Sequence, residues 1–235
     1  MTKQTNDTLR TWYLHDLKKP DIHHGRTTPK VRRLDQWESI EPMSKHGTFW
    51  DATYAVDQAS NRNIFLWSDN HYGHKNIIQY TGRPFENAQQ MNDQMTLNYL
   101  DVVTDNDIVI FCGDVSFMNL DDMNEVLDLL PGYKIQIVGN HDIDRKGKLS
   151  NLNFDERHMC LVLNLPDYNY QLLLTHYPLD KVPPNCFNCH GHIHDNVANP
   201  WNINVCVEHT EYAPQNLTKV IERMQQSTCY ERHDK

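Results

Sequence analysis

The feature that most constrains the fold of this chain is a series of short apolar runs, each of which ends in a polar turn. From residue 64 onward, these runs alternate at first with stretches of helical periodicity, which is typical of α/β proteins. The runs predict strands at residues 64–68, 107–112, 134–138, 158–163, 171–175, 186–189 and 203–207. Helices are predicted at residues 74–80, 87–100, 120–130 and, opened by Pro214, 215–226.

The length of 235 residues is sufficient for one substantial core. Residues 1–60 are polar and irregular, so we interpret them as an N-terminal extension of unknown role and residues 61–235 as the main domain. Residues 48–56 nevertheless carry strand-forming side chains. We therefore expect this part of the extension to pack on the main domain.

Apolar content and net charge limit the cellular environment and the binding partners that we expect for this protein. The longest apolar stretches, such as residues 108–112, are far shorter than the roughly 20 residues that span a bilayer, and the start of the chain lacks the apolar core of a signal peptide. These features predict a cytoplasmic protein without a membrane partner, whose six cysteines are reduced. A net charge of -9 disfavours extended binding along nucleic acid.

Five of the apolar runs end in side chains that commonly bind metal ions. The first leads into Asp-Asn-His, and later runs lead into Gly-Asp, Gly-Asn-His-Asp, Thr-His and Gly-His-Ile-His. A single histidine is most often structural and a single Gly-Asp pair is most often a turn, but five such motifs in series are hard to obtain by chance. The candidate site residues are Asp69, His71, Asp114, Asn140, His141, His176, His192 and His194.

Spacing and ligand type favour two metal ions. Alternate residues of an extended segment point the same way, so Asp69 with His71, and His192 with His194, can each present two ligands to one cavity. Carboxylate, amide and imidazole ligands without thiolates suit Mn, which we favour, as well as Fe, Zn, Ni or Co. Eight such groups exceed the needs of one ion, and Asp114, in the middle motif, is the natural bridge of a two-metal site.

The order of these motifs resembles that of the calcineurin-like metallophosphoesterases. The shared elements are D-x-H at residues 69–71, G-D at 113–114, G-N-H-D at 139–142, H at 176 and G-H-x-H at 191–194, within residues 64–208. The stretch SDNHYGHKNIIQYTGRPF is similar to the opening motif of the small bacterial and phage-type branch. The lack of D-R-G around Asp114, and Asp142 in place of Glu, argue against a protein Ser/Thr phosphatase. The resemblance implies a four-layer αββα sandwich of two mixed β-sheets.

The resemblance also implies a role for each site residue. It implies a first metal ion held by Asp69, His71, Asp114 and His194. It implies a second metal ion held by Asp114, Asn140, His176 and His192. His141 is then the general acid that protonates the leaving group while a metal-bridging hydroxide attacks phosphorus, and Asp142 orients it.

Two further residues of the opening motif are candidates for substrate contact. The guanidinium of Arg83 could bind a phosphate with two hydrogen bonds, and the imidazole of His74 could neutralise a phosphoryl oxygen. The alternatives are a loop-fixing ion pair for Arg83 and a packed helix-start residue for His74.

The function that follows is hydrolysis of a phosphodiester or phosphomonoester, with a nucleotide, a cyclic nucleotide or a nucleic-acid end as candidate substrates. A pyrophosphatase that acts on dinucleotides or nucleotide conjugates would use the same metals. A catalytically idle metal-binding interaction domain is the third alternative. The complete ligand set and the presence of His141 argue against that alternative.

Overall fold

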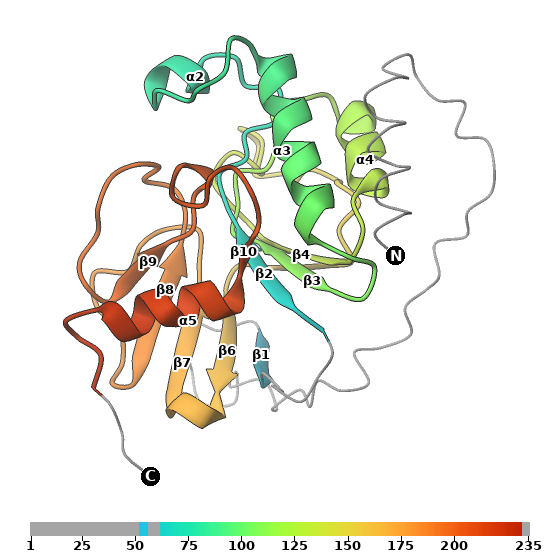
Figure 1. Cartoon of the computed structure of the whole chain (residues 1–235). Coiled ribbons are helices and arrows are strands. Elements are labelled where there is room, and N and C mark those ends of the chain that lie inside the picture. Colours follow the sequence, from blue (N-terminus) through green and yellow to red (C-terminus); the bar gives the residue numbers. More distant parts are fainter. Residues whose placement is uncertain (1–51, 56–61, 232–235) are drawn as a thin grey trace.

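Two β-sheets form the centre of the molecule (Figure 1). The computed structural model describes residues 52–55 and 62–231. The first sheet has the order β10-β2-β3-β4-β5, with β2 (Ile64–Trp67), β3 (Ile108–Phe111), β4 (Tyr133–Ile137), β5 (Glu156–His158) and β10 (Gln215–Asn216). The second sheet has the order β1-β6-β7-β8-β9, with β1 (Ala52–Ala55), β6 (Leu161–Leu165), β7 (Tyr170–Leu174), β8 (Cys186–His190) and β9 (Asn202–Asn204).

Both sheets are mixed. In the first sheet, β2 to β5 run parallel and β10 is antiparallel to β2. In the second sheet, β1 is parallel to β6, β6 is antiparallel to β7, and β7 to β9 run parallel. The predicted α/β class with two mixed sheets is therefore confirmed. The pairing of β1 with β6 also confirms, for residues 52–55, that the strand-like part of the extension packs on the main domain.

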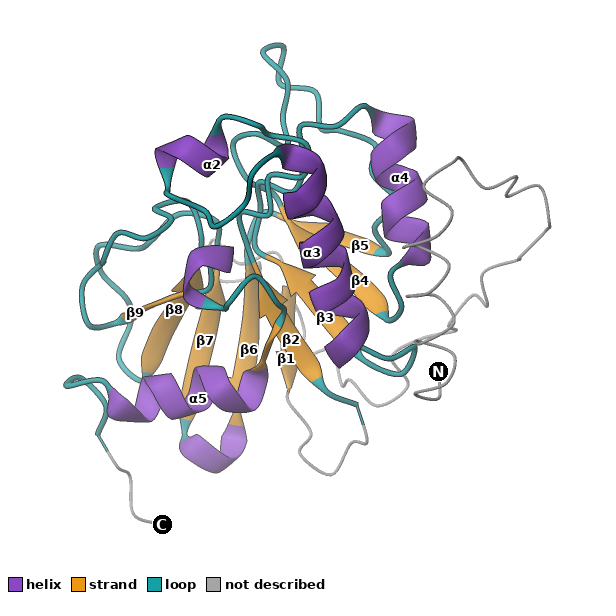
Figure 2. Ribbon diagram, turned by 45° about the horizontal axis from the view of Figure 1, so that its top comes forward, coloured by secondary structure: helices purple, strands orange, loops and turns teal. Residues whose placement is uncertain are grey.

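The helices pack against different parts of the two sheets (Figure 2). They are α2 (Ile77–Tyr80), α3 (Ala88–Val102), α4 (Leu120–Leu129) and α5 (Leu217–Gln226). Ile64 and Leu66 of β2 join the core that the two sheets share, whereas Phe65 and Trp67 on the other face pack with α3 and α4. The buried side of α5 joins the shared core. None of these helices in the described part of the chain combines the length and the apolar character needed to cross a membrane.

The predicted strand at residues 158–163 is divided between the two sheets. β5 ends at His158 in the first sheet and β6 begins at Leu161 in the second, so the chain crosses between the sheets at Met159 and Cys160. A continuous apolar pattern does not show which partner strand each half will pair with, because both halves have strand character.

Two elements near the end of the chain also have bounds that differ from the predicted ones. The helix predicted at residues 215–226 begins at Leu217, because Gln215 and Asn216 pair with β2. The side chain of Asn216 then caps the helix by accepting a hydrogen bond from the Thr218 N–H. The strand predicted at residues 203–207 ends at Asn204 and is followed by a 3-10 turn at Val207–His209.

Parallel strands bring the predicted ligand motifs to one region. The carboxyl ends of β2, β3 and β4 are neighbours in register, and so are those of β7 and β8. A parallel bridge between Ser68, which follows β2, and Cys206, which follows β9, joins the ends of the two sheets. The loops after five strands therefore meet at one end of the molecule.

Candidate metal centre

Six of the predicted ligands form two compact groups in these loops. We call Asp69, His71 and His194 the first ligand group. We call Asp114, His176 and His192 the second ligand group. Within each group, one ligand atom from each residue lies within 4.8 Å of the others, which is close enough for one metal ion to contact all three. The structure therefore contains two groups that could each hold a metal ion, which is compatible with the expected two-metal site.

Asp69 presents one carboxylate oxygen to the first ligand group. Its Oδ2 accepts hydrogen bonds from Ser68 Oγ at 2.7 Å, from the His192 N–H at 2.8 Å and from Cys206 Sγ at 3.2 Å. Its Oδ1 has no hydrogen-bond partner and lies 3.7 Å from His71 Nε2 and 3.9 Å from His194 Nε2. Buried polar atoms are normally paired, so this convergence of unpartnered ligand atoms fits a cation.

His194 is oriented by an ion pair that sequence reasoning did not find. Its Nδ1 lies 3.2 Å from Glu208 Oε1, an arrangement that leaves Nε2 facing Asp69. Arg83 donates hydrogen bonds to the same Glu208 oxygen, from Nε at 3.0 Å and from Nη2 at 2.7 Å. A carboxylate behind a metal-binding histidine is a common way to fix the ring and its tautomer.

The contacts of Arg83 are those of the loop-fixing alternative. Its guanidinium is buried and also donates to the carbonyl oxygens of Asp69 at 2.8 Å and Asn70 at 2.9 Å. Because these bonds and Glu208 occupy its donors, the side chain is directed into the loop and does not face a substrate. Glu208 gave no signal in the sequence, since it lies outside the ligand motifs and 125 residues from Arg83.

Asp114 occupies the position of a bridge between the two ligand groups. Its Oδ1 accepts a hydrogen bond from the His141 N–H at 2.8 Å. Its Oδ2 lies 3.4 Å from His176 Nε2 in its own group and 3.8 Å from His71 Nε2 in the first ligand group. One carboxylate oxygen therefore faces histidines of both groups.

Asn140 lies beside His176 of the second ligand group. His176 Nδ1 lies 2.9 Å from the Cys112 carbonyl oxygen, which can only accept a hydrogen bond, so this nitrogen carries a proton. His176 Nε2 is left to face the side-chain oxygen of Asn140 at 2.9 Å. A metal ion could be bound by both atoms, as was expected for Asn140.

Electrostatics in the centre favour a cation. Burial raises the pKa of Asp69, but the nearby imidazole of His71 and the charges of His176 and His194 outweigh it and hold this pKa well below its usual range. Burial lowers the pKa of His176, but the carboxylates of Asp114 and Asp69 outweigh it and raise the pKa to about 9. The buried carboxylates thus stabilise positive charge beside them, which a bound metal ion would supply in place of a proton.

The ligands converge through left-handed backbone and not through the extended alternation that we expected. Five of the ligand residues have φ between 50° and 70°, namely Asp69, His71, Asp114, His192 and His194. Side chains other than glycine adopt this region at a cost of order 1–3 kcal/mol each, and such residues cluster at functional sites. The expected extended backbone was therefore wrong, because tight turns, and not strand pleating, orient these side chains.

Glycines beside the ligands permit loops to touch each other. A Cβ atom on Gly191 would overlap Ser68 Oγ and Asp69 Oδ2, and one on Gly139 would overlap the Asp114 carboxylate. These two glycines therefore allow one ligand loop to approach its neighbour closely.

His141 lies at the open side of the centre. Its side chain is 47% exposed, and its Nε2 lies 3.9 Å from Asp114 Oδ2. Asp142 is buried, and its carboxylate accepts hydrogen bonds from the N–H groups of Gly139 at 2.8 Å, Asp114 at 3.0 Å and Val115 at 3.1 Å. These bonds clamp two ligand loops together, a role different from the orientation of His141 that we expected for Asp142.

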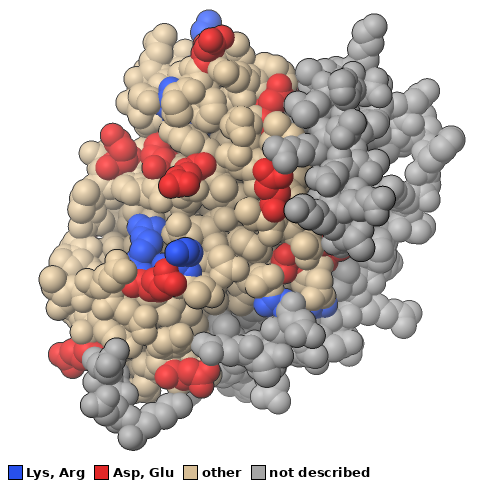
Figure 3. All heavy atoms as spheres, in the orientation of Figure 1, with Lys and Arg blue, Asp and Glu red and all other residues tan. Residues whose placement is uncertain are grey.

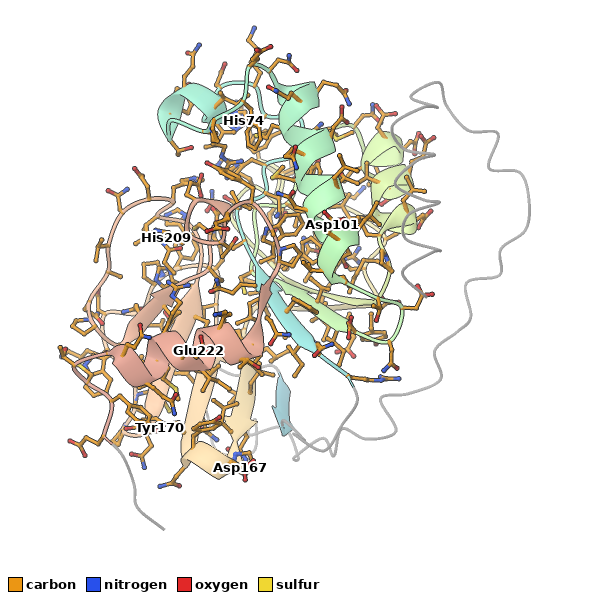
Figure 4. All side chains as sticks on the ribbon, viewed as in Figure 1. His74, Asp101, Asp167, Tyr170, His209 and Glu222 are labelled. Atoms are coloured by element: carbon orange, nitrogen blue, oxygen red, sulfur yellow. The ribbon has the colours of Figure 1, made fainter. Side chains whose placement is uncertain are left out.

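The aromatic ring of Phe117 lies close to three histidines of the site, including His74. Phe117 is 42% exposed and stacks on His74 with ring centroids 4.1 Å apart. The same ring lies 4.9 Å from that of His141 and 5.3 Å from that of His71. Figure 4 shows His74 in the loop region before α2. His74 therefore lies beside the centre, and its contact with a substrate stays a prediction.

Comparisons with known proteins place the chain in a family. No family model matches it. It is 34% identical over 174 residues to the uncharacterized protein MJ1445 of Methanocaldococcus jannaschii. The matched region covers 69% of this chain and 91% of MJ1445. The chain belongs to the MJ1445 family. The crystal structure of AQ665 from Aquifex aeolicus, a protein of unknown function, is also similar, with a TM-score of 0.55, 27% identity and coverage of 69% of this chain and 99% of that one.

Proposed function

We propose that this protein is a two-metal phosphoesterase that hydrolyses a phosphodiester or a phosphomonoester, on a fold of the calcineurin-like type. The observation that carries the proposal is the arrangement around Asp114. Its Oδ2 lies between His176 and His71, which belong to different ligand groups, while unpartnered atoms of Asp69 and His71 converge nearby. A shared carboxylate between two such groups is the usual basis of a two-metal clamp on phosphorus.

The residues present fit two divalent transition-metal ions, with manganese favoured. The first ligand group and Asp114 would hold one ion, and the second ligand group and Asn140 would hold the other. Bound divalent ions act as Lewis acids and lower the pKa of a bound water molecule to about 7. The protein holds several of these residues from behind, because Asp142 binds the N–H groups of Gly139 and Asp114, and Glu208 binds the ring of His194.

His141 is suited to proton transfer. It lies outside both ligand groups, is half exposed and has its ring close to the bridging Asp114. An imidazole in this position can hydrogen-bond a phosphoryl oxygen and protonate the departing alcohol. The backbone of His141 is held by Asp114 Oδ1, so the ring is tied to the same carboxylate that joins the two groups.

The test is a measurement of metal content and hydrolysis on one preparation. We expect about two ions per chain and cleavage of bis(4-nitrophenyl) phosphate in the presence of Mn. Asp114→Asn should abolish hydrolysis because it removes the shared charge. The matched control is Asp121→Asn on the exposed start of α4, which should change neither quantity. Protein that neither binds metal nor hydrolyses the ester after reconstitution would refute the proposal.

A further inference from the structure

A cavity of about 500 Å³ adjoins the candidate metal centre. His192 and His194 belong to its wall, and these residues contribute one ligand to each group. The remaining wall comes from residues 178–180, Ile193, residues 196–199 and Asn202. We call it the Val197 cavity, after a lining residue that is 90% exposed. Whatever occupies this cavity lies directly beside the metal centre.

The wall of the Val197 cavity is more apolar than polar and, apart from its two histidines, carries no basic side chain. Apolar side chains such as Leu179 and Ile193 alternate with three asparagines, and the lining residues include neither lysine nor arginine. Asn199 and Asn202 both donate hydrogen bonds to the Leu179 carbonyl oxygen, which makes this part of the wall rigid. The cavity is therefore preformed for an uncharged group.

A carboxylate at the wall disfavours a second phosphate. Asp180 is exposed and lines the cavity, so a further anionic group there would meet negative charge. Acidic side chains are also spread over the described surface of the face seen in Figure 3, in keeping with the net charge of -9. A phosphate would be held at the metal centre, but a second phosphate beyond it would not be compensated.

We infer that the Val197 cavity binds the uncharged organic group of the ester, of about the size of a nucleoside, directly attached to the phosphate at the metal centre. The inference rests on the proposed function and names the substrate class of the same site. Its volume falls within the range of about 300–1,000 Å³ that is typical of small-molecule sites. Tyr177, which is half exposed with its ring centroid 4.4 Å from that of His192, adds an aromatic surface on the same side. Attachment through one phosphate is thereby favoured over the pyrophosphate linkage of a dinucleotide.

The experiment compares inorganic phosphate, AMP and ADP as ligands of the metal-loaded protein, by titration calorimetry and by inhibition of bis(4-nitrophenyl) phosphate hydrolysis. AMP places adenosine in the cavity, so we expect it to bind at least about tenfold more tightly than inorganic phosphate. ADP bound through its terminal phosphate places a second phosphate near Asp180, so it should bind more weakly than AMP. Equal binding of phosphate and AMP, or tighter binding of ADP, would overturn the inference.

Three variants, one of them a control, test whether AMP occupies the cavity. Val197→Trp fills the cavity from an exposed position and should weaken AMP about tenfold more than inorganic phosphate. Val102→Trp, at the exposed end of α3, is the matched control and should change neither ligand. Asp180→Lys should narrow the difference between AMP and ADP. Loss of AMP and phosphate binding in equal proportion would place the nucleoside elsewhere.

The two proposals fail in different ways. If the protein binds AMP with the predicted preference but hydrolyses no ester, the proposed function is wrong and the cavity assignment stands as a binding site. If it hydrolyses esters but shows no preference for AMP over inorganic phosphate, the proposed function stands and the cavity assignment is wrong.

Discussion

The two ligand groups are fixed in different ways. The first ligand group is braced by side chains, since Ser68 and Cys206 bind Asp69, and the Arg83–Glu208 ion pair orients His194. The second ligand group is held mainly by contacts with the backbone. The Cys112 carbonyl oxygen accepts a hydrogen bond from His176, and loop N–H groups donate hydrogen bonds to the Asp142 carboxylate.

The neighbours of the two groups also differ. Each group has two buried residues and one partly exposed histidine, but the exposed residues Asn140 and His141 lie next to His176 and Asp114 of the second ligand group. We propose that His141 acts on the substrate from this exposed side, whereas Glu208 acts by positioning His194 of the first ligand group. This difference predicts that changes near the second group act on turnover and that changes behind the first group act on metal affinity.

The largest expected effect is that of His141→Ala on the rate. Removing the free imidazole should lower the rate by roughly 10²–10⁴, the usual size of the loss of a general acid, because His141 belongs to neither ligand group. Metal content, measured by elemental analysis, should stay at the wild-type level. A variant that loses metal would make His141 a ligand and erase the distinction between the exposed and the buried sides of the centre.

An intermediate effect is expected for Glu208→Gln on metal affinity. Exchange of the carboxylate weakens the fixation of His194 and removes the partner charge of Arg83, so affinity for one of the two ions should fall about 10–100-fold. Competition with a chelator measures both ions. The matched control is Glu222→Gln, which removes an exposed acid that pairs with Lys219 on α5 and should leave both affinities unchanged.

If Glu208→Gln weakens both ions equally, the ion pair supports the whole centre and not the first ligand group alone. If it weakens neither ion, the orientation of His194 does not depend on Glu208.

The smallest expected effect is that of Cys206→Ala on stability. The thiol is one of three donors to Asp69 Oδ2, and the other two remain, so the free energy of unfolding should fall by about 1 kcal/mol in a urea titration. Cys206→Ser keeps a donor at this position and should be destabilised less. An equal or larger loss in the serine variant would mean that the thiol contributes packing alone.

The sequence alone predicted the chemistry of the centre better than its geometry. The apolar runs predicted most strands of both sheets, although β10 was predicted as part of a helix and β5 and β6 were predicted as one strand, and the polar turns after the runs supplied every member of the two ligand groups. These features are predictable because strand character and ligand type are properties of a few adjacent residues. The role of His141 in turnover stays a prediction of this kind.

The support behind the ligands was not predictable, because it joins residues that are distant in the sequence. Arg83 was a candidate for substrate contact until its pairing with Glu208, 125 residues away, placed it beneath the Asp69 loop. Likewise, Asp142 lies next to His141 in the sequence but is bound to the loops of Gly139 and Asp114. Adjacent residues need not interact, since the backbone can direct their side chains to opposite sides.

What the sequence determined by itself is therefore the set of candidate ligands, their order and the α/β class. Only the tertiary structure decided how the ligands divide into two groups and what holds each of them. The physical reason is that the packing of the two sheets on one core, bridged at Ser68 and Cys206, brings the ends of separate strands together. The left-handed turns that aim Asp69 and Asp114 are then maintained by contacts from both sheets, which no local sequence pattern encodes.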